Sequence, residues 1–151
     1  MSSLAAIAVA SIAISYFSAH PLFWILAWPG TVVHELMHLI VGTVTLGNPV
    51  SFNVFPEPPT DRGQCLGSVE FSNIGWWNAL PVGIAPLLIL PFAIGYAAKM
   101  HFEFTWWGWF TAWVVASIIS QCWPSGSDWR IAFSNKTGLA FYAFLAYLAI
   151  H

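Results

Sequence analysis

The sequence predicts a mainly α-helical membrane protein with about four transmembrane helices, a β-hairpin loop and a short C-terminal apolar helix. Hydrophobic residues form 58% of its 151 residues and charged residues only 7%, whereas a soluble domain carries about 25% charged residues. The mean hydropathy of +0.72 is too high for a chain that must cover itself with a water-facing surface. Long apolar runs recur along the chain, and one polar, proline-rich stretch interrupts them. We therefore expect a single integral membrane domain over residues 1–151.

Composition also restricts the partners of the chain. The formal net charge of −2 argues against nucleic acid, because nucleic-acid-binding proteins carry basic patches. The lipid bilayer is the partner that the composition requires, and ten Trp and four Tyr suit its two interfaces. Cys65 and Cys122 are too few for a disulfide framework, so we expect free thiols.

The first two apolar runs predict one crossing out and one back. Residues 4–19 are uncharged and predict a short first span, which the following His-Pro pair ends. Residues 21–42 predict the second span, with a kink at Pro29. An alternative division extends the first span to Trp28 and begins the second near Thr31.

Residues 43–75 differ in kind from the spans and predict a β-hairpin loop. Val50, Phe52 and Val54 alternate with polar residues, as in a half-buried strand, and the alternation returns in residues 68–72. Proline and glycine between the two runs predict the turn. The open strand edge could bind an extended peptide substrate through Val50, Phe52 and Val54. The alternative is an interfacial loop without a binding role.

Three further apolar runs complete the chain. Residues 76–98 predict the third span despite their prolines, because neighbouring helices can satisfy the carbonyls that proline frees. Residues 104–123 predict the fourth span, and Ser117, Ser120 and Gln121 near its end are expected to face other helices. Residues 137–150 are too short for a full span and predict an interfacial or partly inserted helix. Three of the four basic residues then share the side of the hairpin, so the positive-inside rule places the hairpin in the cytoplasm.

The feature that carries chemistry is the string His34-Glu35-Leu36-Met37-His38, an H-E-x-x-H motif inside the second span. Residues four apart lie on the same face of a helix, so His34 and His38 can offer two imidazoles to one zinc ion. Glu35 projects about 100° around the helix, where it can activate a water as general base. A carboxyl inside a membrane helix costs roughly 2.5–3.5 kcal/mol, and such residues usually mark function. The alternative is a helix whose polar side chains satisfy one another.

A catalytic zinc usually has three protein ligands, so the chain should supply a third. Asp128 lies just past the end of the fourth span, which in the first division crosses in the same direction as the second, and both reach one leaflet. Glu70 is an alternative if the hairpin folds back, and Asp128 could instead cap a following helix after Ser125 or Ser127. The alternative division of the spans would leave Asp128 too far from His34. The other candidate donors are Glu57, Asp61, Glu103, His20, His101 and His151.

These residues resemble the site-2 protease family of intramembrane zinc metallopeptidases. The resemblance is clearest in residues 29–38 and continues in the strand pair and in a later membrane segment that ends in an Asp. It implies cleavage of substrates within or next to the membrane. It also implies His34, His38 and Asp128 as zinc ligands and Glu35 as the base.

The sequence departs from the family pattern around the third ligand. The family often has Gly after this Asp and has Asn and Pro shortly before it, whereas Trp129 follows Asp128 here. No Asn is therefore assigned to hold a substrate, and Asn73 and Asn78 are the candidates. No additional peptide-binding domain interrupts the chain, so it would be a minimal member.

The leading prediction is a zinc-dependent endopeptidase that cleaves a membrane protein within or next to its transmembrane segment. The alternative is a non-proteolytic zinc-binding membrane protein with an interaction or assembly role, in which Glu35 would be dispensable. A metal transporter would need polar ligands staggered across several helices, and these spans offer one cluster. We expect a multi-pass protein of a prokaryotic cell membrane, with its active site nearer the cytoplasm. A regulatory membrane protein or a second copy is a further candidate partner.

Overall fold

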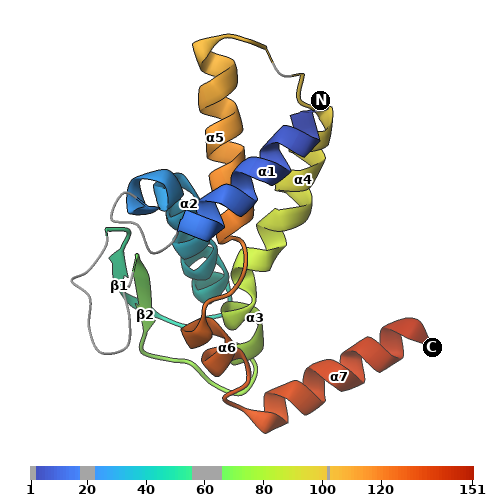
Figure 1. Ribbon diagram of the computed structural model, residues 1–151. Helices are drawn as coiled ribbons and strands as arrows, with labels where there is room; N and C mark the ends of the chain where they lie inside the picture. The colour runs from blue at the N-terminus through green and yellow to red at the C-terminus, as the bar shows by residue number, and fades with distance from the viewer. Residues whose placement is uncertain (1–2, 18–22, 56–65, 102) are drawn as a thin grey trace.

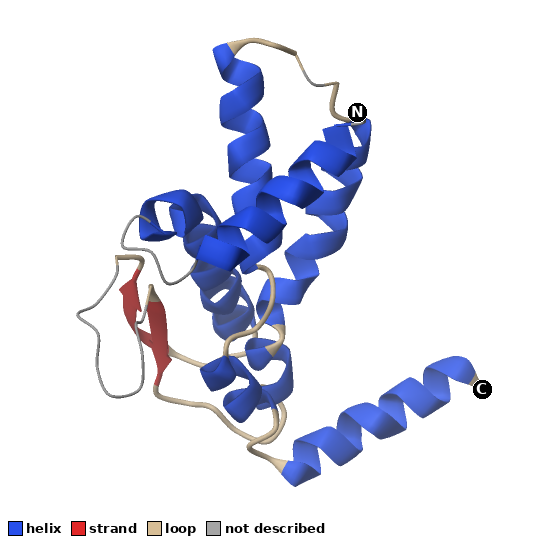
Figure 2. Ribbon diagram, viewed as in Figure 1, coloured by secondary structure: helices blue, strands red, loops and turns tan. Residues whose placement is uncertain are grey.

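The computed structural model describes residues 3–17, 23–55, 66–101 and 103–151. They form a mainly helical protein with one two-stranded antiparallel sheet (Figure 1), and the sheet lies to one side of the helices (Figure 2). This arrangement confirms the predicted helical class and the β-hairpin after the motif helix. The elements are α1 (Ser3–Tyr16), α2 (Phe23–Val44), β1 (Pro49–Asn53), β2 (Ser68–Phe71), α3 (Ala79–Gly83), the 3₁₀ helix η2 (Ala85–Ile89), α4 (Leu90–Lys99), α5 (Trp106–Gln121), α6 (Gly126–Ala132) and α7 (Lys136–Ile150).

Helix α2 carries the motif and begins at Phe23 rather than near Thr31. Its 22 residues pass through Pro29 without ending and reach about 33 Å at about 1.5 Å per residue. Among the described residues, its segment Trp24–Val44 is the one helix long and apolar enough to cross a membrane. The placement of the chain in a membrane therefore rests on α2.

The four predicted transmembrane helices are not confirmed. Helices α1 and α5 have 14 and 16 residues, which is shorter than the roughly 20 residues that a span needs. Residues 76–98 are divided into α3, η2 and α4 instead of forming one helix. Pro86 and Pro91 stand in the first turns of η2 and α4, where the missing N–H of proline is tolerated. These prolines begin new helices rather than kink a continuous one.

Small side chains fill the interface among α1, α2, α4 and α5. Ala27 of α2 and Ala116 of α5 have no exposed surface, and Ile7 and Ile14 of α1 pack into the same cluster. Because alanine is small, it lets two helix backbones approach closely, and such small residues are typical of helix interfaces in membranes. The core therefore holds α2 against α5, the two helices that lead to the motif and to Asp128.

The hairpin packs along α2. Strand β1 pairs with β2 in antiparallel register, with Phe52 opposite Val69 and an irregularity at Val50. A Cβ at Gly42 would overlap the ring of Phe71, so the ring lies directly on the helix. The predicted half-buried face is not found, since Val50 and Phe52 are both exposed. Both strands contact α2, and β2 does so through the ring of Phe71.

Within the described residues, helix α7 contacts the rest of the protein through its first half. Gly138 lies against the backbone of Trp76, whose indole meets the ring of Phe141 edge-on at 5.4 Å. The hydroxyl of Tyr142 donates a hydrogen bond to the carbonyl of Trp77. The second half of α7 projects away from the other helices (Figure 1) and is apolar and exposed.

Candidate metal centre

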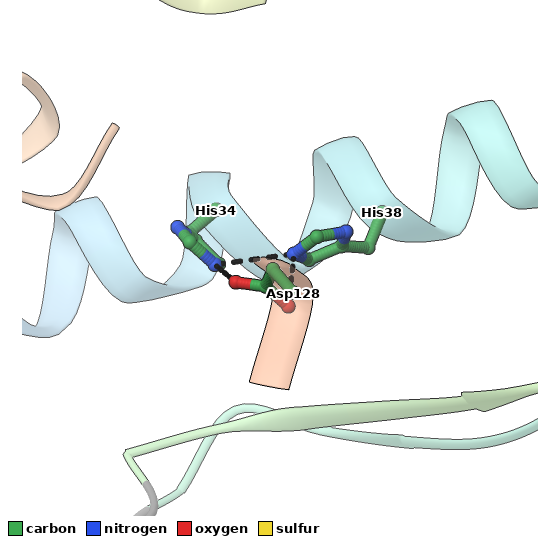
Figure 3. Close-up of side chains that lie close together, drawn as sticks. All are labelled: His34, His38 and Asp128. Carbon is green, nitrogen blue, oxygen red and sulfur yellow. Dashed lines mark hydrogen bonds and ion pairs between the residues drawn. The ribbon is translucent and has the colours of Figure 1, made fainter. Parts of the chain in front are cut away.

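Three side chains from two elements converge at one point (Figure 3). His34 and His38 come from the same face of α2, and Asp128 comes from the first turn of α6. The two Nε2 atoms are 3.2 Å apart, and each is 3.2 Å from an oxygen of Asp128. One nitrogen or oxygen atom from each residue therefore lies within 4.8 Å of the others, which makes a possible metal-binding triad.

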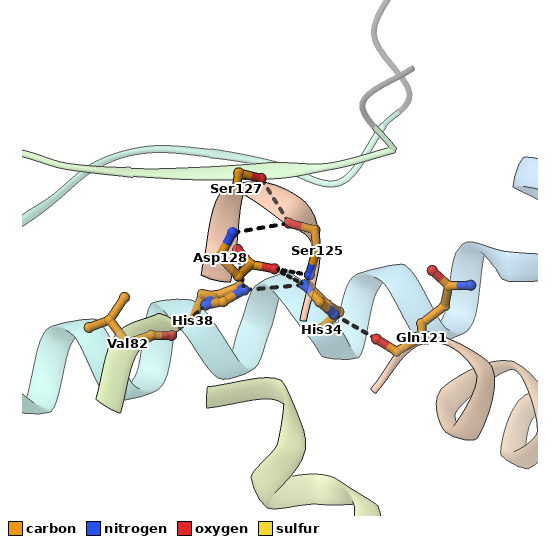
Figure 4. A network of polar contacts seen from close by, with 7 residues as sticks. All are labelled: His34, His38, Val82, Gln121, Ser125, Ser127 and Asp128. Atoms are coloured by element: carbon orange, nitrogen blue, oxygen red, sulfur yellow. Dashed lines mark hydrogen bonds and ion pairs between the residues drawn. The ribbon is translucent and has the colours of Figure 1, made fainter. Parts of the chain in front are cut away.

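Backbone carbonyls hold both imidazoles from behind (Figure 4). His34 Nδ1 is 2.6 Å from the carbonyl oxygen of Gln121, at the end of α5, and His38 Nδ1 is 2.8 Å from that of Val82, in α3. A carbonyl can only accept a hydrogen bond, so each Nδ1 carries the proton and donates it. In the neutral imidazole, each Nε2 is then left with a lone pair that points into the triad.

This donor set fits a cation. Two Nε2 lone pairs and an ionised carboxylate at 3.2 Å would repel one another, and one additional proton could bridge only part of the triangle. Two imidazolium cations at this distance would also repel. The ligand atoms of a tetrahedral zinc, at about 2.0–2.1 Å from the metal, lie roughly 3.3 Å apart. The observed spacing is close to that value, and the second nitrogen of each histidine has the carbonyl partner that metal-binding histidines usually have.

Asp128 combines two roles that the sequence left as alternatives. Its backbone N–H donates to Ser125 Oγ, and its Oδ2 accepts from the Ser125 N–H at 2.6 Å, which together form a capping box at the start of α6. The same carboxylate meets both histidines. Burial alone raises the pKa of Asp128, but the adjacent imidazoles of His34 and His38 and the N–H of Ser125 lower it by more. The pKa is therefore well below its usual range, and the carboxylate is ionised at neutral pH.

Glu35 lies under the hairpin, next to the triad. His38, Glu35 and Asp128 are 5%, 8% and 8% exposed and His34 is half-buried, so the centre is largely shielded from solvent. A Cβ at Gly67 would come within 2.8 Å of Glu35 Cγ, so the backbone just before β2 covers this side chain. The missing side chain at position 67 is what allows this close approach.

The other predicted donors lie elsewhere. Glu70 is exposed on β2 and is absent from the metal-binding group that the described residues form. His101 and Glu103 are exposed between α4 and α5, at the opposite end of α5 from Gln121, and His151 is exposed after α7. Glu57, Asp61 and His20 lie outside the described residues.

The predicted substrate-binding residues are spread over the hairpin and the segment that follows it. Val50 and Phe52 are exposed on β1, and Val54 is half-buried after it. The Asn73 amide donates to the carbonyl of Leu46 at 2.8 Å. The buried Asn78 amide donates to the carbonyls of Asn73 and Thr45 and accepts from the Gly75 N–H. These bonds hold the segment against the end of α2, and a contact with substrate stays a prediction for all five residues.

Sequence reasoning missed the groups that orient the imidazoles. Gln121 and Val82 act through backbone carbonyls, which any residue type supplies, so no pattern in the sequence could have marked them. Gly67 had a weak signal, because a glycine next to a strand often allows a close approach of backbone. Cys122 is a buried free thiol, as expected, and Cys65 lies outside the described residues.

Comparison of the chain with protein-family models, with curated proteins and with solved structures finds no match. The family resemblance of residues 29–38 therefore stays a prediction. The metal-binding triad rests on the geometry of α2, α5 and α6 alone.

Proposed function

We propose that the chain is an intramembrane zinc endopeptidase that cleaves a membrane protein within or next to a transmembrane segment. The observation that carries the proposal is the triad of His34, His38 and Asp128, with Glu35 beside it on the same helix. Three protein ligands suit a catalytic zinc, which keeps a fourth position open, whereas structural zinc sites usually have four protein ligands.

Each residue has a distinct part in the proposed reaction. His34, His38 and Asp128 would hold the ion, and the carbonyls of Gln121 and Val82 keep the imidazoles in the binding tautomer. Zinc, when bound, supplies a Lewis acid for the water and for the scissile carbonyl. The Glu35 carboxylate takes a proton from the attacking water and passes it to the leaving nitrogen. Glu35 therefore returns to its carboxylate form at the end of the cycle.

The position of the site indicates the class of substrate. The histidines and Glu35 lie in α2, the helix that is long and apolar enough to cross a membrane. A peptide bond that reaches them lies at the same depth, in a segment that is unwound, because a helix keeps its carbonyls in internal hydrogen bonds. The hairpin next to Glu35 is the element against which such an extended segment could pair.

The burial of the site favours a second candidate, a zinc-binding membrane protein without proteolysis. Glu35, His38 and Asp128 are all buried, and the hairpin would have to move for a peptide to reach them. In this alternative the ion would tie α2 to α6 and strengthen the fold, and Glu35 would be dispensable. Both candidates need the metal. They differ in the role of Glu35, which is essential for proteolysis and dispensable in the alternative.

The test compares Glu35→Gln with the wild-type chain in lipid nanodiscs. Zinc content is measured by atomic emission, and cleavage by mass spectrometry on a panel of single-span reporter proteins with Gly- or Pro-interrupted spans. We expect Glu35→Gln to keep about one zinc per chain and to lose at least roughly 100-fold in cleavage rate, the scale of a lost general base.

Glu103→Gln is the matched control, because it makes the same change on an exposed carboxylate at the opposite end of α5. It should retain both zinc and cleavage. A Glu35→Gln protein that cleaves as fast as this control would refute the proposed mechanism. A wild-type protein that holds zinc and cleaves nothing in the panel would favour the non-proteolytic alternative.

A further inference from the structure

Side chains of α5 bond to the backbone of α2 at the turn that contains Pro29. Ser117 Oγ accepts a hydrogen bond from the Gly30 N–H at 2.8 Å. Four residues earlier on both helices, Trp113 Nε1–H donates to the carbonyl of Leu26 at 3.0 Å. These bonds cross between helices, so they fix the position of α2 against α5 and not only the shape of each helix.

The hydrogen bond that holds His34 belongs to the same series. It lies four residues beyond the Gly30–Ser117 contact on both helices, with Gln121 O as acceptor for His34 Nδ1–H at 2.6 Å. In all three contacts the partners are 87 residues apart in the sequence. The two helices therefore run in the same direction and are joined by three rungs, one turn apart. The rungs are Leu26–Trp113, Gly30–Ser117 and His34–Gln121.

The helix backbones are in close contact at the middle rung. A Cβ at Gly30 would overlap the carbonyl of Ser117 and would lie 2.8 Å from Gln121 Cγ. Ser117 has no exposed surface, and its hydroxyl also donates to the carbonyl of Ala27 at 3.0 Å. The carbonyl of Ala27 also accepts from the Thr31 hydroxyl at 3.3 Å, so the Ser117 bond adds a contact between helices to a carbonyl that already has a partner within α2.

We infer that Ser117 is a positioning residue for the metal centre, an inference that rests on the proposed zinc site. Its two bonds set the register of α2 against α5, which places the Gln121 carbonyl behind His34 and brings Asp128, seven residues further along, to the front. A slip of one residue would move His34 by about 1.5 Å and turn it by about 100°. Metal–ligand distances tolerate only about 0.2 Å.

The test uses Ser117→Ala in the full chain, with Ser11→Ala as the matched control. Ser11 is a buried serine of α1 whose hydroxyl bonds to the carbonyls of Ile7 in α1 and Ala116 in α5, the neighbour of Ser117, rather than to the backbone of α2. Zinc affinity is measured by competition with a chromophoric chelator, and Co²⁺ is bound to report ligand geometry through its visible absorption. We expect Ser117→Ala to weaken zinc binding about tenfold, the lower end for groups behind metal ligands, and to change the Co²⁺ spectrum. Ser11→Ala should change neither.

Trp113→Phe provides a second variant if Ser117→Ala does not fold. It removes the indole N–H of the first rung and keeps a smaller aromatic ring against the core. A shifted Co²⁺ spectrum in either variant supports the inference, and spectra and affinities equal to those of Ser11→Ala overturn it. A wild-type chain that binds zinc without cleaving the reporter proteins would favour the non-proteolytic alternative and leave the inference about Ser117 standing. Failure of the wild type to bind zinc would overturn both.

Discussion

The two halves of α5 differ in the exposure of their side chains and in the contacts that they make. In the aromatic half, residues 106–110, Trp106, Trp107 and Trp109 are 65%, 60% and 59% exposed. In the inner half, residues 113–121, Ala116 and Ser117 have no exposed surface. The aromatic half makes ring contacts mainly within itself, such as the 3.9 Å stack of Trp106 on Trp107. The inner half bonds to α2 through Trp113, Ser117 and Gln121.

The difference shows how one apolar helix can serve two surroundings. Large amphipathic rings with exposed faces suit a membrane interface, where Trp is enriched. Small residues and hydroxyls suit a close contact between helices inside the protein. Both halves are largely apolar, so apolar character alone does not separate them. The size of the side chains and their hydrogen-bonding groups do.

Asp128→Asn should have the largest effect on the inner side of this comparison. The amide oxygen of Asn can still accept from the Ser125 N–H and keep the cap of α6, but the charge that pairs with the two histidines is lost. We expect zinc affinity to fall by more than the roughly 10–100-fold that is typical for groups behind the ligands. Isothermal titration with zinc in nanodiscs measures it. Unchanged affinity would remove Asp128 from the set of ligands.

Gly30→Ala should have the next largest effect, on stability. The added methyl group would overlap the Ser117 carbonyl, so α2 and α5 must move apart, at a cost of about 1–3 kcal/mol in the free energy of unfolding. Gly95→Ala in α4 is the control, since nothing lies within 4 Å of the new Cβ, and alanine there should stabilise by about 0.5–1 kcal/mol. Unfolding in mixed detergent micelles measures both. Equal stability of the two variants would mean that the helices are not in close contact at Gly30.

Trp107→Ala should have the smallest effect on the metal centre. Its ring is exposed at the far end of α5 from Gln121, so zinc affinity should be unchanged and stability should fall by no more than about 0.5 kcal/mol. Quenching of Trp fluorescence by lipids brominated at different depths provides the complementary measurement. If the aromatic half lies at the interface, shallow bromines should quench most, and the variant should lose part of that signal. Strongest quenching at the bilayer centre would contradict this placement.

Some of the fold and most of the site follow from local patterns in the sequence. The spacing of His34 and His38 places both on one face wherever a helix forms, because residues four apart always do so. The hairpin was found from alternation and from its proline-rich turn, although its exposed strand face was not. Four continuous spans were predicted from hydropathy, but hydropathy does not register that Pro86 and Pro91 begin new helices in the third of them.

The sequence by itself determined the apolar class, the motif on a helix and the short list of acids from which a third ligand could come. Tertiary structure alone decided that Asp128 is the acid that meets the imidazoles, and that carbonyls of Gln121 and Val82 hold them from behind. The physical reason is that residue types and their spacing determine which side chains share one turn of a helix. A contact across 44 or more residues depends on how two helices pack, and a backbone carbonyl is the same at every position.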